Sequence, residues 1–225
     1  MTSESPTPGR TIAIGDIHGC LAAFLRLIDA LDLQPEDTLV TLGDYVDRGP
    51  DTRGVIERLL ELESRCRLVT LLGNHEEMLL GARDGTVDAG FWLACGGLAT
   101  LSSYGAATSV EQIPGEHLDF LENCRLYYEQ DTHFFVHANY LPDVTLDEQG
   151  RDMLLWRSLR AFTPGPHYSG KTAVVGHTCQ PDGEIYDLGY LKCIDTCCYR
   201  QGWLTAFDVA SGHVWQANQD GDLRS

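Results

Sequence analysis

Residues 11–31 read TIAIGDIHGCLAAFLRLIDAL, and this stretch points to the fold class. The apolar run at residues 11–14 is typical of a buried β-strand, which Gly15-Asp16 would end. Apolar residues then recur every three or four positions, which predicts a helix with one buried face. That face consists of Leu21, Phe24, Leu25, Ile28 and Leu31.

The same unit occurs twice more along the chain. Residues 38–42 predict a strand that ends at Gly43-Asp44, and residues 68–72 predict a strand that ends at Gly73-Asn74. Helical periodicity follows both strands, first through Val55, Ile56, Leu59, Leu60 and Leu62, and then from about Glu76. Three consecutive units of this kind indicate an α/β fold with parallel strands and right-handed crossovers.

The second half of the chain is richer in strands. Residues 88–103 indicate a helix despite Gly96-Gly97, and residues 116–123 indicate a short one. The predicted strands are residues 126–129, 133–137, 172–176, 190–194, 204–209 and 213–216. The last four lack intervening helices, so we expect hairpins and antiparallel pairs among them. We therefore predict one domain at residues 11–218, two packed mixed β-sheets flanked by helices, with a disordered tail at 1–10 and another tail at 219–225.

The charge of the chain excludes several classes of partner. Its 225 residues include 33 acidic and 16 basic side chains, which gives a formal net charge of −17. Since no cluster of Lys or Arg interrupts this acidity, general binding to nucleic acid or to an anionic membrane is disfavoured. No apolar run approaches the roughly 20 residues of a membrane-spanning helix. Any anion that the protein handles must therefore be attracted by a local field.

The N-terminal residues and the cysteines bear on the cellular compartment in which the protein works. Residues 1–10 lack the apolar core of a secretory signal, so we expect a cytoplasmic protein. In that compartment the eight cysteines are expected to be reduced thiols, with Cys20 and Cys179 as small packing residues. The role of the adjacent pair Cys197-Cys198 stays open.

Polar side chains follow five of the predicted strands, at the edge where ligands bind in open α/β sheets. Those with metal-binding chemistry are Asp16, His18, Asp44, Asn74, His137 and His177. Asp16 and His18 are two positions apart, so their side chains would point the same way. Oxygen and imidazole donors without a thiolate suit Mn²⁺, Fe or Zn²⁺, and a shared carboxylate could bridge two such ions.

The five blocks around these residues resemble the calcineurin-like metallophosphoesterase superfamily, whose fold is an αββα sandwich. The blocks are Asp16-Ile-His18, Gly43-Asp-Tyr-Val-Asp-Arg-Gly49, Gly73-Asn-His-Glu76, His137 and Gly176-His177. The second and third blocks are similar to the phosphoprotein phosphatase branch, which includes bacterial Ser/Thr phosphatases. The resemblance covers residues 12–178 and keeps all five blocks in the expected order.

The resemblance implies a role for each matched residue. Asp16 and His18 would hold one divalent ion, Asp44 would bridge two, and Asn74, His137 and His177 would complete the second; Mn²⁺ is the first choice, with Fe or Zn²⁺ as alternatives. Arg48, Asn74 and Arg157 would bind the substrate phosphate, with Arg160 competing for the role of Arg157. His75 would be the general acid, oriented by Asp47, while a hydroxide bridging the two metals attacks phosphorus directly.

Simpler interpretations exist for each block taken alone. Gly-Asp after a strand is a common turn, Asn74 could cap a helix, and His137 and His177 could be hydrogen-bonded core residues. These interpretations fail jointly, because they require five coincidences in one order. The remaining histidines, His117, His133, His167 and His213, have no such context and are expected to have no role in the site.

Three functions are consistent with this pattern. The leading hypothesis is a Ser/Thr protein phosphatase-like enzyme that hydrolyses phosphomonoesters of a phosphorylated protein or a small molecule. The second is a symmetrical dinucleoside tetraphosphatase, a diadenosine tetraphosphate hydrolase; Asp47 and Arg48 count against it. The third is a non-catalytic, metal-bearing binding module, which would be expected to lack a ligand or the acid. A nuclease is disfavoured by the acidity of the chain.

Overall fold

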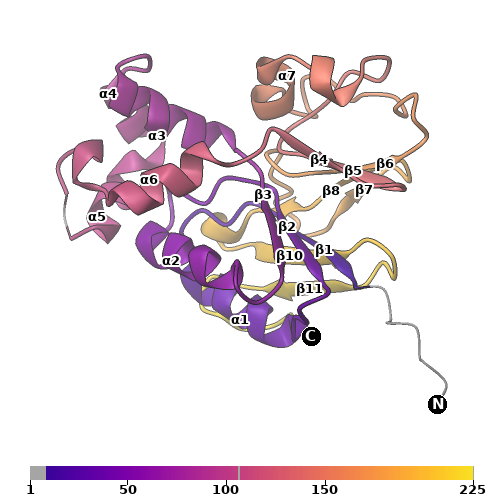
Figure 1. The fold of residues 1–225 in the computed structure, drawn as a ribbon, viewed down its shortest axis with the longest axis horizontal. Coiled ribbons are helices and arrows are strands. Elements are labelled where there is room, and N and C mark those ends of the chain that lie inside the picture. The colour runs from indigo at the N-terminus through magenta and orange to yellow at the C-terminus, as the bar shows by residue number, and fades with distance from the viewer. Residues whose placement is uncertain (1–8, 106, 225) are drawn as a thin grey trace.

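Two β-sheets lie face to face in the computed structural model, which describes residues 9–105 and 107–224 (Figure 1). In the first sheet the strand order is β11-β10-β1-β2-β3, and β9 pairs with β10. Its strands are β1 (Thr11–Ile14), β2 (Thr38–Thr41), β3 (Arg67–Thr70), β9 (Asp195–Thr196), β10 (Trp203–Asp208) and β11 (Val214–Ala217). The predicted parallel pairing of β1 with β2 and of β2 with β3 is confirmed.

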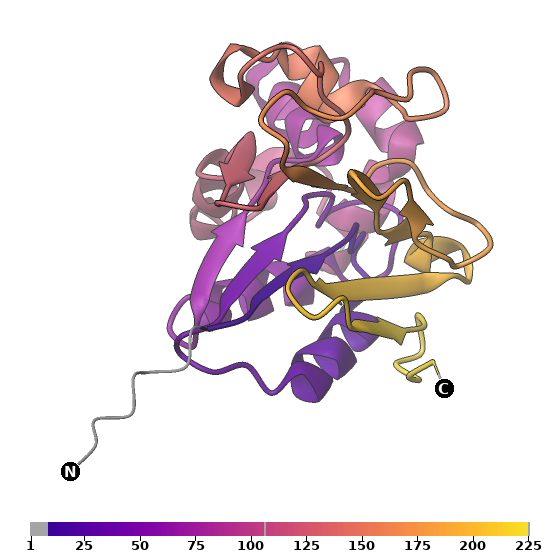
Figure 2. The ribbon, with the colours of Figure 1, turned by 90° about the vertical axis from the view of Figure 1, so that its right-hand side faces the viewer.

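The second sheet has the strand order β4-β5-β6-β8-β7. Its strands are β4 (Tyr127–Glu129), β5 (His133–Val136), β6 (Thr172–Val175), β7 (Tyr186–Asp187) and β8 (Leu191–Cys193). Figure 2 shows these strands in red and orange above the first sheet, where the yellow C-terminal strands lie beside the indigo ones. Both sheets are mixed, so the predicted fold of two packed mixed sheets flanked by helices is confirmed.

The expected antiparallel pairing among the last four predicted strands is found for one pair and not for another. The expected antiparallel pairing holds for β10 and β11, but β6 pairs with β8 in parallel. The chain can return to start β8 in the same direction because β7 lies between the two in sequence and pairs with β8 antiparallel. A strand of two residues is too short to produce a recognisable hydrophobic alternation.

The helices cover the outer faces of the two sheets (Figure 1). The α-helices are α1 (Leu21–Leu31), α2 (Thr52–Leu62), α3 (Asn74–Asp84), α4 (Ala89–Trp92), α5 (Leu98–Ser103), α6 (Gly115–Glu122) and α7 (Arg151–Trp156). A π-helical turn at Leu93–Gly97 joins α4 to α5, and single 3₁₀ turns lie at Val110–Gln112, Leu146–Glu148 and Cys198–Arg200. Helix α7 was not predicted from the sequence.

Alternating side chains of each strand divide the core into layers. In β1, Ile12 and Ile14 pack with the helices of the first sheet, whereas Ala13 lies in the apolar layer between the sheets. In β5, Phe134 points to the side of α7, whereas Phe135 lies between the sheets. Strands with both faces covered by apolar residues are typical of sheets buried on both sides. This burial fixes the register of the strands and therefore the positions of the loops that follow them.

Hydrogen bonds and an ion pair hold the two ends of the described chain against the domain. The Arg10 backbone N–H donates to Asp37, and its guanidinium pairs with the same carboxylate. Near the other end, the Arg224 guanidinium donates to Gln216 at 2.7 Å. Residues 1–8 and 225 lie outside the described residues, so the domain limits of 11–218 and the two tails stay predictions. No helix of the described residues has both the length and the apolar character needed to cross a membrane.

Candidate dinuclear metal centre

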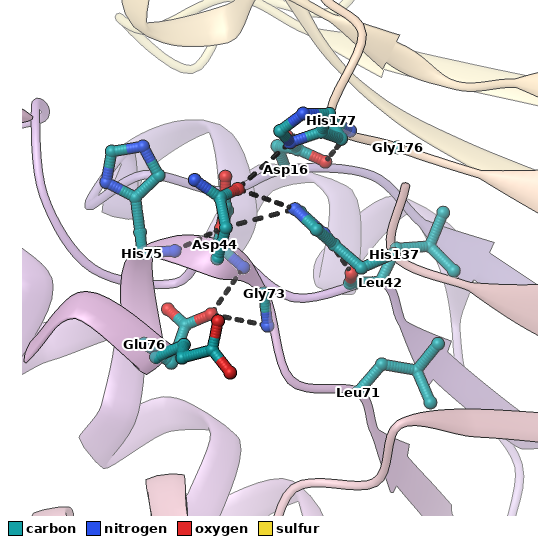
Figure 3. A network of polar contacts seen from close by, with 12 residues as sticks. Asp16, Leu42, Asp44, Leu71, Gly73, His75, Glu76, His137, Gly176 and His177 are labelled. Carbon is teal, nitrogen blue, oxygen red and sulfur yellow. Dashed lines mark hydrogen bonds and ion pairs between the residues drawn. The ribbon is translucent and has the colours of Figure 1, made fainter. Parts of the chain in front are cut away.

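The six predicted metal ligands come together where strands of both sheets end. Figure 3 shows four of them, Asp16, Asp44, His137 and His177. Asp16 and His18 follow β1, Asp44 follows β2, and Asn74 begins α3 after β3. The second sheet contributes His137 after β5 and His177 after β6. Because the first three strands are parallel, their carboxyl ends meet at one edge, and the packing of the two sheets brings the histidines to that edge.

Asp44 lies at the centre of two donor clusters. One consists of His18, Asp44 and His75, and the other of Asp44, His137 and His177. The Asp44 Oδ2 atom is 3.3 Å from His18 Nε2, and its Oδ1 atom is 3.5 Å from His137 Nε2. Asn74 Oδ1 joins the second cluster, 3.0 Å from His137 Nε2 and 2.9 Å from His177 Nδ1. A carboxylate with one oxygen in each cluster has the geometry of a bridging ligand.

Backbone carbonyls orient two of these imidazoles. His18 Nδ1 donates to Val46 O and His137 Nδ1 donates to Leu42 O, each at 2.8 Å. A carbonyl oxygen can only accept, so the proton is on Nδ1 in both rings and the Nε2 atom of each points towards Asp44. Metal-binding histidines are commonly oriented in this way. The donor set therefore fits divalent cations between these nitrogens and the Asp44 carboxylate.

Asp16 belongs to neither donor cluster, but its carboxylate lies against the backbone of His177, which belongs to the second. Both of its carboxylate oxygens accept from the His177 backbone N–H at 3.1 Å. Burial, followed by the charges of Asp195 and Asp44, raises the pKa of Asp16 well above its usual value. Three buried carboxylates near one another are costly without a neighbouring positive charge. Asp195 had no predicted role, since only the fold brings it beside Asp16.

Burial and the histidines shift two further pKa values. Burial alone would raise the pKa of Asp44, but His137, His75 and His18 hold it well below its usual value. Burial and the neighbouring His137 lower the pKa of His177 to about 4. Near pH 7 the Asp44 side chain is therefore an anion and His177 is neutral, the protonation states that metal ligation requires.

His75 and Asp47 form the predicted acid pair. His75 Nδ1 is 2.7 Å from Asp47 Oδ2, and the Asp47 side chain is fully buried. Asp47 also accepts from Thr100 Oγ1 at 2.8 Å and from Trp92 Nε1 at 3.1 Å. These two donors come from the helical segment 88–103, which fixes the carboxylate so that it can hold the imidazole in one orientation.

Glu76 stabilises the loop that carries Asp44. Its carboxylate accepts from the backbone N–H groups of Gly73, Asp44, Tyr45 and Val46 at 2.8–3.1 Å. Burial and the Asp44 charge raise the pKa of Glu76 to about 8, against the lowering effect of these donors. The sequence places Glu76 in the third block, but this structural role is visible only in the fold (Figure 3).

Five of the predicted site residues have left-handed backbone conformations. The φ angles are 45° for His18, 52° for Asp44, 71° for Asp47, 68° for Arg48 and 60° for His177. Non-glycine residues rarely adopt this region, and such conformations persist where the surrounding structure imposes them. Gly96 allows one close approach, because a Cβ atom there would lie 2.8 Å from the Arg48 backbone nitrogen. Backbone strain is therefore concentrated at the edge where the donors meet.

The predicted phosphate-binding arginines lie in different places. Arg48 Nη1 is 3.0 Å from His18 Nε2, so its guanidinium reaches the metal centre. Arg160 lines the same cavity as Arg48 and His177, and it donates to Cys179 O. Arg157 lines a separate cavity with Leu141 and Trp156. The role predicted for Arg157 stays a prediction, and Arg160 shares a cavity with Arg48.

Three of the other histidines have ordinary hydrogen-bond partners for their rings. His117 pairs with Tyr104, His133 with Thr132, and His167 with Ser169 and the Val144 carbonyl. Neither donor cluster includes these residues or His213. That they have no role in the site stays a prediction.

The expectation of eight reduced cysteines is wrong for one pair. Cys179 and Cys197 form a disulfide, whereas Cys20, Cys66, Cys95, Cys124, Cys193 and Cys198 are free. The two partners are 18 positions apart, and packing brings the loop after β6 against the turn after β9. Cys179 is two residues beyond His177, so the bond ties the His177 loop to the turn that carries Tyr199. The expectation that Cys179 is a simple packing residue is also wrong.

We expect the Cys197→Ser variant to be less stable than the parent protein under non-reducing conditions. Closing a loop of this length contributes about 3 kcal/mol through the unfolded state. The free energy of unfolding in urea, measured with and without a reductant, tests this. With reductant present the difference between the variant and the parent should shrink to below about 1 kcal/mol. Titration of eight free thiols in the denatured, unreduced parent would contradict the disulfide.

Proteins with similar sequences include a protein phosphatase and dinucleoside tetraphosphatases. A family model described as calcineurin-like phosphoesterase matches residues 9–215. Serine/threonine-protein phosphatase 1 of Salmonella typhimurium is 30% identical over 200 residues, which cover 85% of this chain and 88% of that protein. The symmetrical bis(5′-nucleosyl)-tetraphosphatase of Nitrosomonas europaea is 32% identical over 139 residues, which cover 61% of this chain and 47% of that protein. The chain spans about half the length of the tetraphosphatases that it matches.

Solved structures share the fold at lower identity. A serine/threonine phosphatase from Saccharomyces cerevisiae has a TM-score of 0.66 at 17% identity, covering 98% of this chain and 79% of that chain. A cold-active protein tyrosine phosphatase has a TM-score of 0.69 at 16% identity, covering 97% and 78%. At these identities the likeness concerns the arrangement of sheets and helices.

Proposed function

The chain belongs to the calcineurin-like phosphoesterase family, and on that premise we propose that it hydrolyses phosphate monoesters at a dinuclear metal centre, as Ser/Thr protein phosphatases do. The observation that carries the proposal is the convergence of two donor clusters on one carboxylate, Asp44. When bound there, two divalent ions supply hydroxide at neutral pH and offset the charge on the phosphoryl oxygens. Mn²⁺ is the ion that we propose first, with Fe or Zn²⁺ as alternatives.

The chain's own residues would bind the phosphate and move the proton. The Arg48 guanidinium presents a planar fork that can donate to two phosphoryl oxygens at once. His75 Nδ1 is engaged by Asp47, so Nε2 is the atom that would donate a proton to the leaving oxygen. Asn74, at the start of α3, is proposed to contact both a metal and the phosphate.

The proposal is tested by turnover of the protein after its metal is removed and replaced with Mn²⁺, Fe²⁺, Zn²⁺ or Mg²⁺. A phosphoserine peptide and diadenosine tetraphosphate should be assayed side by side at equal concentrations. We expect metal-dependent release of phosphate from the peptide. Exclusive turnover of the dinucleotide would reverse the order of the two candidate substrates. Two bound metal equivalents without turnover of either would instead support the binding-module hypothesis.

Symmetrical hydrolysis of dinucleoside tetraphosphates is the second candidate function. Several relatives carry that name, including the Nitrosomonas europaea protein. The Asp47-Arg48 pair, within the second block, is the sequence feature that favours the phosphatase. The chain spans about half the length of those tetraphosphatases, so we propose their activity as the second candidate after phosphate monoester hydrolysis.

We expect Arg48→Ala to weaken phosphate binding more than it slows turnover. Charge-assisted hydrogen bonds contribute about 1.5–3 kcal/mol, which corresponds to a rise in KM of roughly 10- to 100-fold. KM for p-nitrophenyl phosphate and the inhibition constant of inorganic phosphate measure this change. Arg26→Ala, on the exposed side of α1, is the matched control and should leave both constants at their parent values. Unchanged KM and kcat in Arg48→Ala would show that this guanidinium does not bind the phosphate.

A further inference from the structure

The His177 ring is oriented by the backbone carbonyl of Trp156, the last residue of α7. His177 Nε2 lies 3.1 Å from that oxygen, which can only accept, so Nε2 carries the proton. In the neutral ring the lone pair is then on Nδ1, which faces Asn74 Oδ1 at 2.9 Å. His18 and His137 have the opposite arrangement, with the proton on Nδ1. Of the two His177 nitrogens, Nδ1 is therefore the one available to a cation in the second donor cluster.

The C-terminal end of α7 contacts the chain at both histidines of the second sheet. A helix leaves its last carbonyl groups without partners inside the helix. The Leu154 carbonyl accepts from the Ala138 backbone N–H at 2.7 Å, directly after His137. The Trp156 carbonyl accepts from the His177 ring. The position of this helix end therefore bears on two of the predicted metal ligands.

Glu77 on α3 holds α7 by its two ends. The Glu77 Oε2 atom accepts from Trp156 Nε1 at 2.6 Å, and the Oε1 atom accepts from the Arg151 guanidinium at 2.8 Å. Arg151 and Trp156 are the first and the last residue of α7. A helix of six residues depends on tertiary contacts for its position, and hydrogen bonds to a carboxylate are stronger than those between neutral groups. Glu77 therefore fixes the helix end that orients His177.

The bond between Glu77 and Trp156 joins the two layers of the domain. Helix α3 packs on the first sheet, whereas α7 packs on the second (Figure 1). The two residues are 79 positions apart, and neither belongs to the five sequence blocks. Trp156 is 37% exposed and Glu77 is half-buried, so neither side chain is needed to fill the core. Their contact thus links the start of α3, where Asn74 lies, to the loop that carries His177.

We propose that Glu77 and Trp156 are positioning residues for the second metal ion, acting through the orientation of His177. The inference rests on the proposed function, which places that ion at the second donor cluster. Partners outside the ligand set typically change metal affinity by roughly 10- to 100-fold. Glu77 acts one step further away, because it holds the indole while the backbone of the same residue accepts from His177. We therefore expect an effect at the lower end of that range.

Binding of Mn²⁺ to the metal-free full chain, followed by calorimetry and electron paramagnetic resonance, tests the inference without a substrate. We expect two ions per chain in the parent protein, with the spectrum of a magnetically coupled pair. In Glu77→Ala and Trp156→Phe the dissociation constant of one ion should rise by about tenfold, while that of the other stays unchanged. Trp156→Phe keeps an aromatic ring and the backbone carbonyl but removes the N–H donor. Glu122→Ala, which removes an exposed carboxylate paired with Arg83, is the matched control and should bind both ions as the parent does.

The variant Glu77→Gln separates positioning from charge. The glutamine side-chain oxygen can still accept from the indole of Trp156, so we expect metal affinity close to that of the parent protein. An equal loss of affinity in Glu77→Gln and Glu77→Ala would show that the negative charge of Glu77 attracts the ion, and this would overturn the inference. Unchanged dissociation constants in both Glu77→Ala and Trp156→Phe would overturn it as well.

Failure of the inference can be distinguished from failure of the proposed function. If the parent protein binds no metal, the proposed function fails, and the tautomer of the His177 ring still tests the inference in the metal-free protein. A proton–nitrogen correlation spectrum of the histidine rings should place the proton on Nε2 in the parent and show both tautomers in Glu77→Ala. A pure Nε2 tautomer in both Glu77→Ala and Trp156→Phe would show that these residues do not orient the ring.

Discussion

Removing bound metal with a chelator is expected to abolish phosphoester turnover and to weaken phosphate binding at the same time. A net charge of −17 repels anions, and two divalent ions supply the largest positive charge that the site can hold. Without them Arg48 would have to bind a dianion beside the carboxylates of Asp16 and Asp44. We expect turnover to fall by more than about 10³-fold, since the metals supply both hydroxide and charge compensation. Steady-state rates and calorimetric titration with phosphate measure the two effects separately.

Restoring the metal provides the control for this experiment. Addition of Mn²⁺ should recover turnover in the parent protein, but not in Asp44→Ala, which lacks the carboxylate shared by both donor clusters. Metal analysis of that variant should find fewer than two equivalents, and a thermal unfolding curve shows whether the domain is still folded. Full turnover by the chelated parent protein would rule out a metal-dependent mechanism.

The donor residues could be predicted from the sequence because each one is marked by a pattern in its own neighbourhood of the chain. Each ligand directly follows an apolar strand, and parallel strands place their carboxyl ends at one edge. The register of β1, β2 and β3 then brings Asp16, Asp44 and Asn74 together without further information. The same reasoning predicted the two mixed sheets, since each strand is marked by its own apolar run.

Other features of the site depend on contacts between distant segments. Trp92 and Thr100 reach Asp47 across 45 and 53 positions, and nothing near Asp47 in the sequence indicates them. The Cys179–Cys197 disulfide and the Tyr199 ring beside Arg48 likewise depend on how two loops pack. Strand β7 was missed for a different reason, because its two residues carry too little pattern. Sequence patterns therefore predicted the donor residues that come together at the sheet edge better than the residues that hold them in place.

His75→Asn is expected to lower turnover by roughly 10²–10⁴-fold while the metal content stays the same. Asparagine cannot supply a proton near neutral pH, so the leaving oxygen would depart as an anion. The loss should be larger for alkyl phosphates such as phosphoserine than for p-nitrophenyl phosphate, whose phenolate is a stable leaving group. Rates for both substrates, together with metal analysis, measure this difference. His133→Asn, at a histidine whose ring pairs with Thr132 Oγ1 away from both donor clusters, is the matched control.

The same variant separates two roles that the geometry allows for His75. Its side chain belongs to the cluster with His18 and Asp44, yet its Nδ1 atom is engaged by Asp47 at 2.7 Å. A metal ligand replaced by asparagine would lower metal content and slow both substrates alike. A general acid would leave metal content unchanged and produce the dependence on the leaving group. Retained turnover of alkyl phosphates would remove His75 from the acid role, and it would leave the buried Asp47, with its contacts to Trp92 and Thr100, as a structural anchor for the loop that carries Arg48.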